Sequence, residues 1–448
     1  MNKKIIYFIS IFLFIAAVIF IIARYNSKQK EKENTVYTLL DRKGSLTQTS
    51  EWSTTKNLAN TYLSSLKKDP KDTKASLGLA ALYIQEARVT GNYMYYDAAA
   101  MKYVNSVLKT DSVNFDALVY KSLIYLSQHH FADGLATAQK AKEINPYNAF
   151  VYGILIDGNV EMGYYDSAVS SADKMVSIRP DLRSYSRISY LREIYGDYPG
   201  SIDAMKRAVE AGAAGEESTE WARVQLGALY EKTGDLKSAE MHYTISLQVR
   251  PDYAYALAGL ARIVAASKDY NKAISYYLKA DSLVSDYSFK EELVDLYKLT
   301  GEKDKADKTA KEVIENLNTA ATKGNSDENI GHYADRELAY AYLKISDYDK
   351  AFEHAMLEYN RRPENIDVNE TLAWVDYYKT DYANAIKYIT VALKTKCKNP
   401  TLLSRAGLIY NKSGDKAMAK SLLQQALANN PNINAELKEE CISTMKTL

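Results

Sequence analysis

The sequence predicts an all-α protein: a superhelical solenoid of about ten helix-turn-helix repeats with an N-terminal transmembrane helix. The first observation is a fixed period, because Pro146 and Pro180 are 34 residues apart and Pro363 and Pro431 are twice that. The second is composition: 8 prolines and 19 glycines in 448 residues suit a mostly helical chain. The third is an uncharged apolar run near the amino terminus. A period of this size marks an array whose units bury their apolar faces against their neighbours.

The apolar run covers residues 5–23 and carries no charge. A helix of that length spans about 28 Å, close to the hydrocarbon core of a bilayer at about 30 Å. The run is longer than the apolar part of a secretory signal peptide, and Ile21, Ile22 and Ala23 make a poor cleavage site. We therefore expect an uncleaved signal anchor at 5–23, after a short tail at 1–4 and before a polar linker at 24–50.

The orientation of this anchor is less clearly marked. Lys3 and Lys4 precede it, and four basic residues follow it within residues 24–32, so the positive-inside rule gives no clear winner. The opening Met-Asn-Lys-Lys resembles a bacterial export signal. It favours repeats outside the cytoplasm, in the periplasm, while a cytoplasm-facing orientation stays open.

The clearest repeat unit runs from 220 to 253. Leu226, Gly227 and Tyr230 are followed by Ala239-x3-Tyr243 and then by proline. This unit resembles the tetratricopeptide signature L-G-x2-Y, A-x3-F/Y, P. We expect the solenoid at 51–433 and a capping helix at 434–448. About residues 54–433 resemble bacterial tetratricopeptide-repeat proteins, including a widespread bacterial group without a defined activity. The resemblance implies scaffolding or peptide binding.

Repeat positions have local physical roles. Gly227 is expected where the first helix of a repeat, helix A, touches the second, helix B. One acidic series falls just before helix B, where Asp can cap the free N–H groups of the first turn: Asp197, Asp235, Asp269, Asp347, Asp381 and Asp415. Departures from the period predict extra residues near 87–96, 212–215 and 320–330, the last as a loop.

Chemistry-bearing motifs are not found. The net charge of +1 implies no attraction to nucleic acid, and the sequence holds no phosphate-binding loop, metal-ligand spacing or nucleophile elbow. We expect no enzyme activity, no cofactor and no metal, and we interpret all five histidines as packed or surface residues. The cysteines Cys397 and Cys441 are expected to be ordinary packed thiols, with a single bridge between them left open.

Binding is the remaining function class. The resemblance implies a concave face lined by helix A, and reading its positions off this chain gives a candidate ligand groove of Tyr190, Trp221, Arg262, Arg336, Tyr340, Trp374, Tyr377 and Tyr378. Aromatic and Arg side chains are enriched in binding hot spots. The alternative for each residue is packing against the adjacent repeat, and Trp374, beside the core residue Leu372, is the strongest case. The Lys and Asn pair of the clamp that grips a chaperone's terminal carboxylate is missing.

The sequence therefore favours a membrane-anchored scaffold or adaptor that binds protein or peptide partners in the bacterial cell envelope. Two alternatives stay open. Aromatic faces can also stack on sugars, so the array could bind a glycan or cell-wall polymer as an accessory to export or assembly. A cytoplasmic array would instead act as a membrane-bound adaptor.

Overall fold

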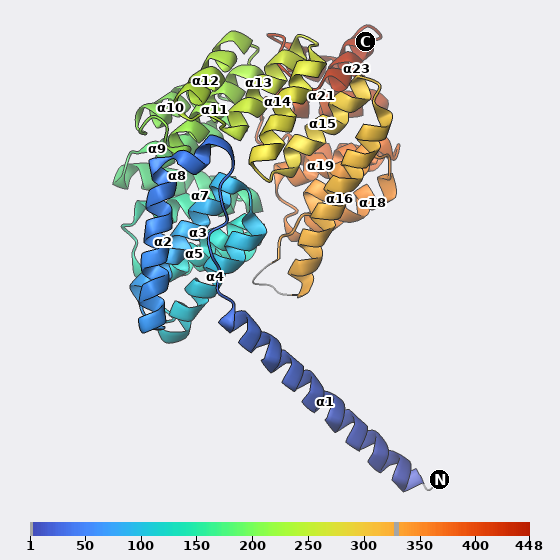
Figure 1. Ribbon diagram of the computed structural model, residues 1–448. Coiled ribbons are helices and arrows are strands. Elements are labelled where there is room, and N and C mark those ends of the chain that lie inside the picture. The colour runs from blue at the N-terminus through green and yellow to red at the C-terminus, as the bar shows by residue number, and fades with distance from the viewer. Residues whose placement is uncertain (1–2, 327–330) are drawn as a thin grey trace. The chain divides into compact units, whose positions relative to one another are not determined.

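The computed structural model describes residues 3–326 and 331–448, and the chain forms two compact units, residues 1–40 and 41–448 (Figure 1). All regular elements in these ranges are helical. The all-α prediction is confirmed for the described residues.

The first unit contains helix α1 (Lys3–Asn34). Its segment Tyr7–Ser27 has 21 residues, a mean hydropathy of 2.5 and no buried residues, so it is long and apolar enough to cross a membrane. A signal sequence near the amino terminus would have the same properties. The helix runs on past the expected anchor at 5–23 and through the first part of the expected linker at 24–50.

The second unit begins with the short 3-10 helix η1 (Gly44–Gln48) and helix α2 (Ser50–Lys68). Residues 41–49, expected to belong to the linker, pack on the repeats. Buried Arg42 places its guanidinium 2.6 Å from Glu86 and 2.8 Å from Glu51. A buried charge held by two carboxylates fixes this segment in place, because breaking such a pair is costly.

Ten helix pairs follow in the described residues, and we number them as repeats 1–10, each with helix A before helix B. They are α3 (Thr73–Thr90) and α4 (Tyr93–Thr110); α5 (Phe115–Ser127) and α6 (Phe131–Ile144); α7 (Ala149–Met162) and α8 (Tyr165–Ile178); α9 (Leu182–Ile194) and α10 (Tyr198–Glu210); α11 (Glu217–Lys232) and α12 (Leu236–Val249); α13 (Ala254–Ala266) and α14 (Tyr270–Leu283); α15 (Tyr287–Leu299) and α16 (Lys303–Ser326); α17 (Asp335–Lys344) and α18 (Tyr348–Arg361); α19 (Ile366–Tyr378) and α20 (Tyr382–Ala392); and α21 (Pro400–Lys412) and α22 (Lys416–Leu427). Helix α23 (Ala435–Met445) packs on α21 and α22 at the end of the array.

The acidic series before helix B consists of helix caps, as expected. Asp197, Asp235, Asp269, Asp347, Asp381 and Asp415 each accept a hydrogen bond from the backbone N–H three residues further on. The contact between the two helices of a repeat also matches the expectation. A Cβ added at Gly227 would lie 2.5 Å from the ring of Tyr243 on helix B, so only glycine permits this approach.

The extra residues mostly lengthen helices. In repeat 1, the residues around 87–96 extend α3 and α4 to 18 residues each. The loop expected at 320–330 is wrong in its first part, because α16 continues to Ser326 and residues 327–330 lie outside the described residues. Leu317 and Ala320 are buried, so apolar contacts carry the helix beyond the usual repeat length. The extra residues near 212–215 do lie in a loop, between α10 and α11.

The array winds far enough that its two halves touch, and Figure 1 shows the blue-green half beside the yellow-orange half. Hydrogen bonds join residues 201 to 205 positions apart, close to six repeat lengths. In each case the turn between helices A and B of one repeat meets the loop that follows helix B five repeats later. We call these contacts the winding seam.

The seam follows one pattern along the array. The turn of repeat 1 meets the loop after repeat 6, and the pattern continues to repeats 5 and 10. The backbone bonds are Ser285 N–H to Thr90 O at 3.1 Å, Tyr333 N–H to Gln128 O at 3.0 Å, and Asn432 N–H to Glu231 O at 3.0 Å. The segment before α2 takes part as well, because the Ser45 N–H donates to Asp252 at 3.0 Å.

Glycines allow the seam to close. A Cβ at Gly163 would lie 2.3 Å from the backbone of Glu364, and one at Gly234 would lie 1.9 Å from the carbonyl oxygen of Asn429. Both glycines have positive φ, of +81° and +84°, which is the left-handed conformation common at helix C-termini. Glycine at these turns therefore serves both the end of helix A and the approach of the next winding.

Candidate functional site

The A helices form the inner layer of the winding. Successive A helices contact one another, as in α5 with α7, α11 with α13, and α19 with α21. Arginines tie neighbouring A helices together. Arg187 on α9 donates to Asp157 on α7 at 2.6 Å, and Arg262 on α13 donates to Glu231 on α11 at 2.9 Å. These charge-assisted bonds hold the spacing of the inner layer.

Five of the eight expected groove residues lie in one connected group on repeats 8 to 10. We call it the Trp374 cluster: Arg336, Tyr340, Tyr348, Trp374, Tyr377, Tyr378 and Arg405. Sequence reasoning named Arg336, Tyr340, Trp374, Tyr377 and Tyr378, and it missed Tyr348 and Arg405.

Arg405 on α21 is the centre of the Trp374 cluster. Its guanidinium carbon lies 5.2 Å from the ring centroids of both Tyr340 and Trp374. It also donates to the Tyr340 hydroxyl at 2.8 Å and to Glu370 at 3.0 Å. Burial raises the pKa of Glu370, and the nearby Arg405 opposes that rise. The spacing of 35 residues between Glu370 and Arg405, about one repeat, is the signal that could have identified the pair.

The aromatic side chains of the cluster reach from the inner layer to the surface. Trp374 stacks on Tyr377 at 4.8 Å and meets the edge of Tyr378 at 5.1 Å. Tyr378 stacks in turn on Tyr348 at 5.5 Å. Trp374 and Tyr377 are buried, whereas Tyr378 keeps 41% of its surface exposed. Trp374 is therefore a packed side chain, as its position beside Leu372 suggested. Tyr378 is the solvent-accessible end of the aromatic group.

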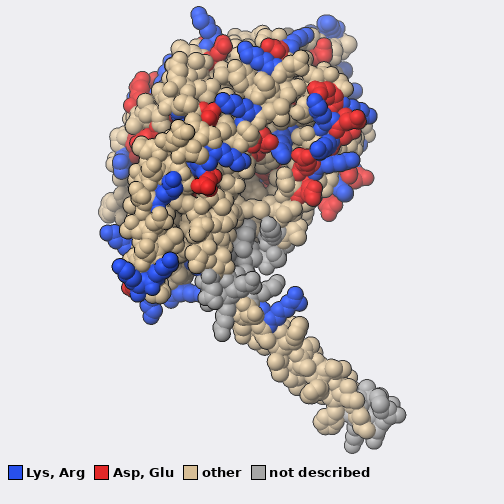
Figure 2. Space-filling model, in the orientation of Figure 1, with Lys and Arg blue, Asp and Glu red and all other residues tan. Residues whose placement is uncertain are grey.

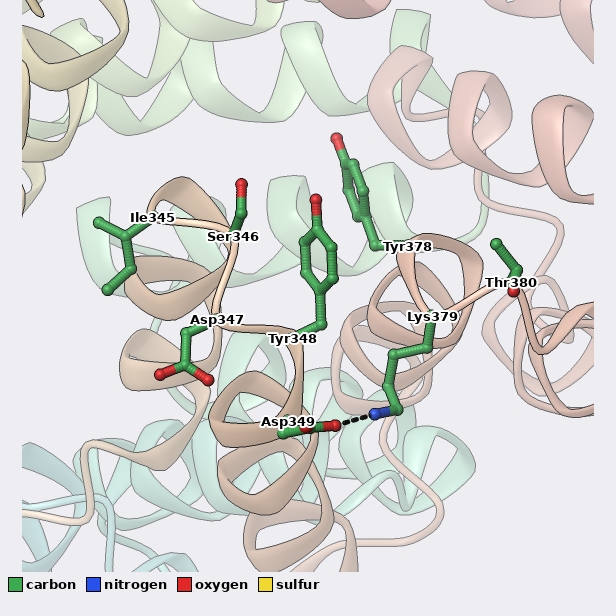
Figure 3. Close-up of a pocket in the computed structure, with 8 residues that line it drawn as sticks. All are labelled: Ile345, Ser346, Asp347, Tyr348, Asp349, Tyr378, Lys379 and Thr380. Carbon is green, nitrogen blue, oxygen red and sulfur yellow. Dashed lines mark hydrogen bonds and ion pairs between the residues drawn. The ribbon is translucent and has the colours of Figure 1, made fainter.

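A depression of about 620 Å³ opens beside Tyr348 and Tyr378 (Figure 3). It is formed by the turns between helices A and B of repeats 8 and 9, with Asp347, Asp349 and Lys379 among its lining residues. Figure 3 shows the two phenol rings side by side, and Lys379 paired with Asp349 below them. The site thus combines an aromatic floor with charges of both signs at its edge.

Tyr190 lies elsewhere, between two windings. It lines a cavity of about 60 Å³ together with Glu370 and Cys397, which belong to the later winding. This volume has room for only a few water molecules. Tyr190 keeps 42% of its surface accessible, and loss of solvent around the phenol, followed by the charge of Asp367, raises its pKa. Tyr190 approaches the Trp374 cluster through Glu370, the partner of Arg405.

The two remaining groove residues lie apart from the cluster. Trp221 on α11 is half-buried and packs on the apolar group around Leu226. Arg262 binds Glu231, whose carboxylate also accepts from the Asn432 side chain at 2.8 Å. Arg262 therefore supports the seam between repeats 5 and 10.

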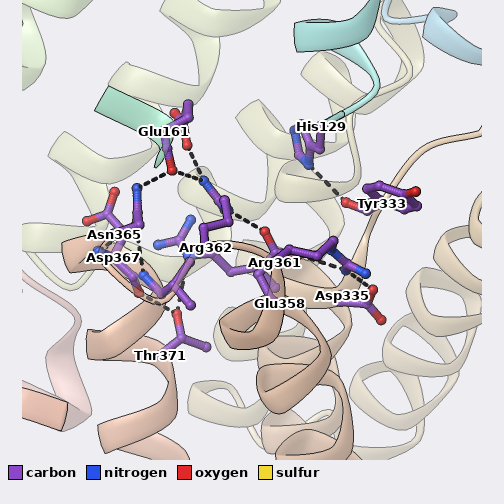
Figure 4. Close-up of polar contacts among 12 residues, drawn as sticks. His129, Glu161, Tyr333, Asp335, Glu358, Arg361, Arg362, Asn365, Asp367 and Thr371 are labelled. Carbon is purple, nitrogen blue, oxygen red and sulfur yellow. Dashed lines mark hydrogen bonds and ion pairs between the residues drawn. The ribbon is translucent and has the colours of Figure 1, made fainter. Parts of the chain in front are cut away.

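The seam between repeats 3 and 8 is held by several polar contacts (Figure 4). Arg362 pairs with Glu161 of the earlier winding and with Glu358 of its own helix. The side-chain amide of Asn365 donates to the carbonyl oxygens of Val160 at 3.2 Å and Glu161 at 3.0 Å. The Tyr165 hydroxyl accepts from the Ile366 N–H at 2.9 Å.

Histidines gather at the neighbouring seam between repeats 2 and 7, although they are scattered in the sequence. His129 and His332 have ring centroids 4.2 Å apart, and His130 stacks on Tyr333 at 4.1 Å. Burial lowers the pKa of His332 to about 4. Three groups here, on His129, His332 and Glu337, could ligate a metal ion. Sequence spacing could not show this cluster, because the winding creates it.

The cysteines lie far apart in sequence and are both free and buried. The Cys397 thiol donates to the Glu193 carbonyl across the seam at 3.6 Å. Burial raises the pKa of Cys397 to about 12 and that of Cys441 to about 11. Neither thiol forms appreciable thiolate at neutral pH, so both should react slowly.

Comparison with known proteins agrees with the helical repeats. Two family models described as tetratricopeptide repeat match residues 224–287 and 400–433. Together with the paired helices and the capped, periodic turns, these two matches support a tetratricopeptide-repeat protein. No curated protein matches the chain.

Solved structures of the same architecture also match. A thermophilic tetratricopeptide protein of Thermus thermophilus is 19% identical, with 42% of this chain and 97% of that one covered and a TM-score of 0.37. PilW, titled a widely conserved type IV pilus biogenesis factor, is 17% identical, with 45% and 93% covered and a TM-score of 0.38. The Cut9–Hcn1 assembly of the APC/C is 17% identical, with 88% and 74% covered and a TM-score of 0.38.

Proposed function

We propose that this chain is a membrane-anchored scaffold that holds a protein or peptide partner against the Trp374 cluster, in the envelope of a bacterial cell. The observation that carries the proposal is the continuous path from exposed Tyr378 and half-buried Tyr348 to Trp374 and Arg405 beside an open depression. Tyr, Trp and Arg dominate binding hot spots, because they offer large contact areas at low entropic cost. The proposal includes no catalytic step.

The eight residues named from the sequence remain the proposed contact residues, with Tyr378 as the most accessible of the cluster. Arg405 preorganises the cluster, because its bonds to Tyr340 and Glu370 hold three A helices in register. A partner that reached Trp374 would therefore meet a rigid surface, which lowers the entropic cost of binding. The charged pair of Lys379 and Asp349 would form part of the polar rim.

Site-specific photo-crosslinking tests the partner site. A photoreactive phenylalanine analogue would replace Tyr378 in the full-length chain, in its native host, and the crosslinked proteins would be identified by mass spectrometry. The control position is Tyr147, which is 79% exposed and lies in the loop between repeats 2 and 3. We expect a discrete crosslinked protein at Tyr378 that is lost when Tyr348 is changed to Ala. Equal capture at Tyr147 would contradict the site. Retention on purified polysaccharide instead would favour the glycan alternative.

The orientation proposed is repeats outside the cytoplasm, anchored by α1. The apolar segment Tyr7–Ser27 supports an anchor by its length and hydropathy. Figure 2 shows that α1 is largely free of charge along its visible face, whereas acidic and basic side chains are interspersed over the visible face of the repeats. A mixed-sign surface of this kind suits a water-soluble domain held at a membrane.

A membrane-impermeant thiol reagent tests this orientation in whole cells. The native thiols are buried and have raised pKa values, so they provide a low background. The Lys308→Cys variant adds a reactive site, because the Lys308 side chain is 79% exposed on α16. Labelling in intact cells is the expected result. Labelling only after lysis would place the repeats in the cytoplasm.

A further inference from the structure

The seam between repeats 2 and 7 holds a cluster that neither the sequence motifs nor the family match assigns. One ligand atom each from His129, His332 and Glu337 lies within 4.8 Å of the others. His129 belongs to the turn after α5, His332 precedes α17, and Glu337 lies in the first turn of α17. The three side chains therefore come from two windings, with more than 200 residues between them.

The surroundings of the cluster fit metal ligands. The His129 Nδ1 lies 3.0 Å from the carbonyl oxygen of Tyr333, as Figure 4 shows, and His332 makes a hydrogen bond with the backbone of Ser127. A histidine that ligates a metal usually donates its other ring N–H to such a carbonyl, which fixes the tautomer and leaves the second nitrogen for the ion. Each of the two imidazoles thus makes one hydrogen bond to the backbone, as is usual for a metal-ligating histidine.

Glu337 supplies the anionic ligand. Its Oε2 is buried and accepts no hydrogen bond from any described residue. Its Oε1 lies 3.7 Å from His129 Nδ1, the nitrogen that contacts the Tyr333 carbonyl and is not the one left for the ion. A buried carboxylate oxygen without a partner is costly, and coordination to a cation would remove that cost. The charge of Arg336 acts on Glu337, but its guanidinium lies over Tyr340 and donates to Thr371. Arg361, whose guanidinium lies over Tyr333, is bound to Asp335 and Glu358.

We infer that His129, His332 and Glu337 form a binding site for a divalent transition-metal ion of the zinc class, which fastens the two windings together. Two imidazoles and one carboxylate form a common zinc ligand set, with a fourth position left for water. In a tetrahedral site the ligand atoms lie about 3.3 Å apart. The separation within 4.8 Å therefore needs only small side-chain rotations to close.

The site has a structural role at this place in the fold. The extended helix α16 departs from the regular repeat length in the repeat that precedes His332. The neighbouring seam between repeats 3 and 8 is held by the ion pair of Arg362 with Glu161. A metal ion would provide the corresponding link at the irregular repeat. Because binding to the folded state stabilises that state, the ion would favour the closed winding.

The test uses the full-length chain in detergent with a tag that contains no histidine. After removal of metal with a chelator, Co²⁺ is titrated while its visible d–d absorption is recorded, and Zn²⁺ is then added in competition. We expect one Co²⁺ per chain, displaced by Zn²⁺, and greater protection of the Tyr333 amide from hydrogen exchange when Zn²⁺ is present.

Three variants and one control assign the ligands. Glu337→Gln keeps the shape of the side chain, His332→Gln removes the second imidazole, and His129→Asn keeps a residue that tolerates the positive φ of 60° at that turn. Each should weaken Co²⁺ binding at least about tenfold. His242→Gln, on α12 outside the cluster, should bind like the parent chain. Absence of a Co²⁺ signal in the parent, or equal binding in all variants, would overturn the inference even if a variant is poorly folded.

Discussion

The turns of the first five repeats and those of the last five occupy the same place in the repeat but have different surroundings. A Cβ at Gly163 or Gly234 would collide with the backbone of the next winding. A Cβ at Gly301 or Gly414, at the turns of repeats 7 and 10, would meet no described atom within 4 Å. All four glycines have positive φ. The difference shows that the repeat determines the backbone conformation of the turn. The winding determines which residues, if any, pack against that turn.

The same contrast distinguishes turns that stabilise the fold from turns that are open to a binding partner. The turns of the early repeats are occupied by the later winding, whereas those of repeats 8 and 9 form the open depression beside Tyr348 and Tyr378. A turn in the seam is covered by the next winding and cannot contact another molecule. The turns of repeats 8 and 9 remain open, and we therefore place the proposed partner site there.

The largest expected effect on stability comes from adding a side-chain atom at a turn that the next winding covers. Gly163→Ala should lower the free energy of unfolding by about 2–5 kcal/mol, because left-handed strain of about 1–2 kcal/mol adds to overpacking of about 1–3 kcal/mol. Gly414→Ala should lose only the strain. Chemical denaturation of both variants measures the difference. Equal losses would mean that the windings do not touch at this turn.

The second effect concerns the ion pair across the seam. Arg362→Met should cost about 2–3 kcal/mol, because Glu161 and Glu358 lose a buried partner. The loss is below the upper range for buried pairs, since Glu358 retains Arg361. The matched control is Lys379→Ala at an open turn, where the partner Asp349 is 92% exposed, and it should change stability by less than about 1 kcal/mol. A larger loss in the control than in Arg362→Met would reverse the comparison.

The third effect is confined to one repeat. Gly227→Leu should cost about 1–3 kcal/mol by overpacking helix A against Tyr243 of helix B. This contact does not cross the seam, so protection of the seam amides of Ser285 and Tyr333 from hydrogen exchange should stay close to the parent. Thermal melting gives the stability. A neutral melt would show that the helix register in repeat 5 is wrong.

The smallest effect tests whether the inner layer of A helices is closed to water. We expect it to be closed if the two windings pack against each other. Burial raises the pKa of Glu291 on α15 to about 8 from 4.5. The folded chain therefore binds this proton more tightly than the unfolded chain, and stability is lost as pH rises from about 4.5 to about 8. Because the Glu291 side chain is only half-buried, solvent screens most of this effect, and Glu291→Gln should gain about 1 kcal/mol over the parent at pH 8.5 compared with pH 4.5.

Denaturation at the two pH values measures this gain. The control is Glu315→Gln, which removes an exposed carboxylate from the adjacent helix α16 and should change stability by less than about 0.5 kcal/mol at both values. If the two variants respond alike, Glu291 is in contact with bulk water and the inner layer is open.

The sequence predicts what depends on the 34-residue period. The Asp caps, the Gly227 contact and the order of the helix pairs follow from local rules that repeat in every unit. The loop at 320–330 failed because buried Leu317 and Ala320 favour helix over the polar residues that suggested a loop. The groove residues named in repeats 8 and 9 lie on α17 and α19 and join one cluster through Arg405, whereas Tyr190, Trp221 and Arg262 lie outside it.

The winding seam could not be predicted in the same way. Its residues are about six repeats apart, and their meeting depends on small rotations between repeats that accumulate along the array. Arg362 and Glu161 carry no local signature of their pairing, and neither do His129 and Glu337. Arg405 is different, because a charge one repeat after Glu370 is visible in the sequence once the A helices are aligned.

Hydrogen exchange resolved to single amides tests the docked windings most directly. The amides of Ser285, Tyr333 and Asn432 lie in loops and donate only across the seam, to Thr90, Gln128 and Glu231. In the full-length chain these three amides should exchange much more slowly than the amide of Tyr147, in a loop of the first winding. Exchange of all three at the rate of Tyr147, with the flanking helices still protected, would show that the windings do not dock.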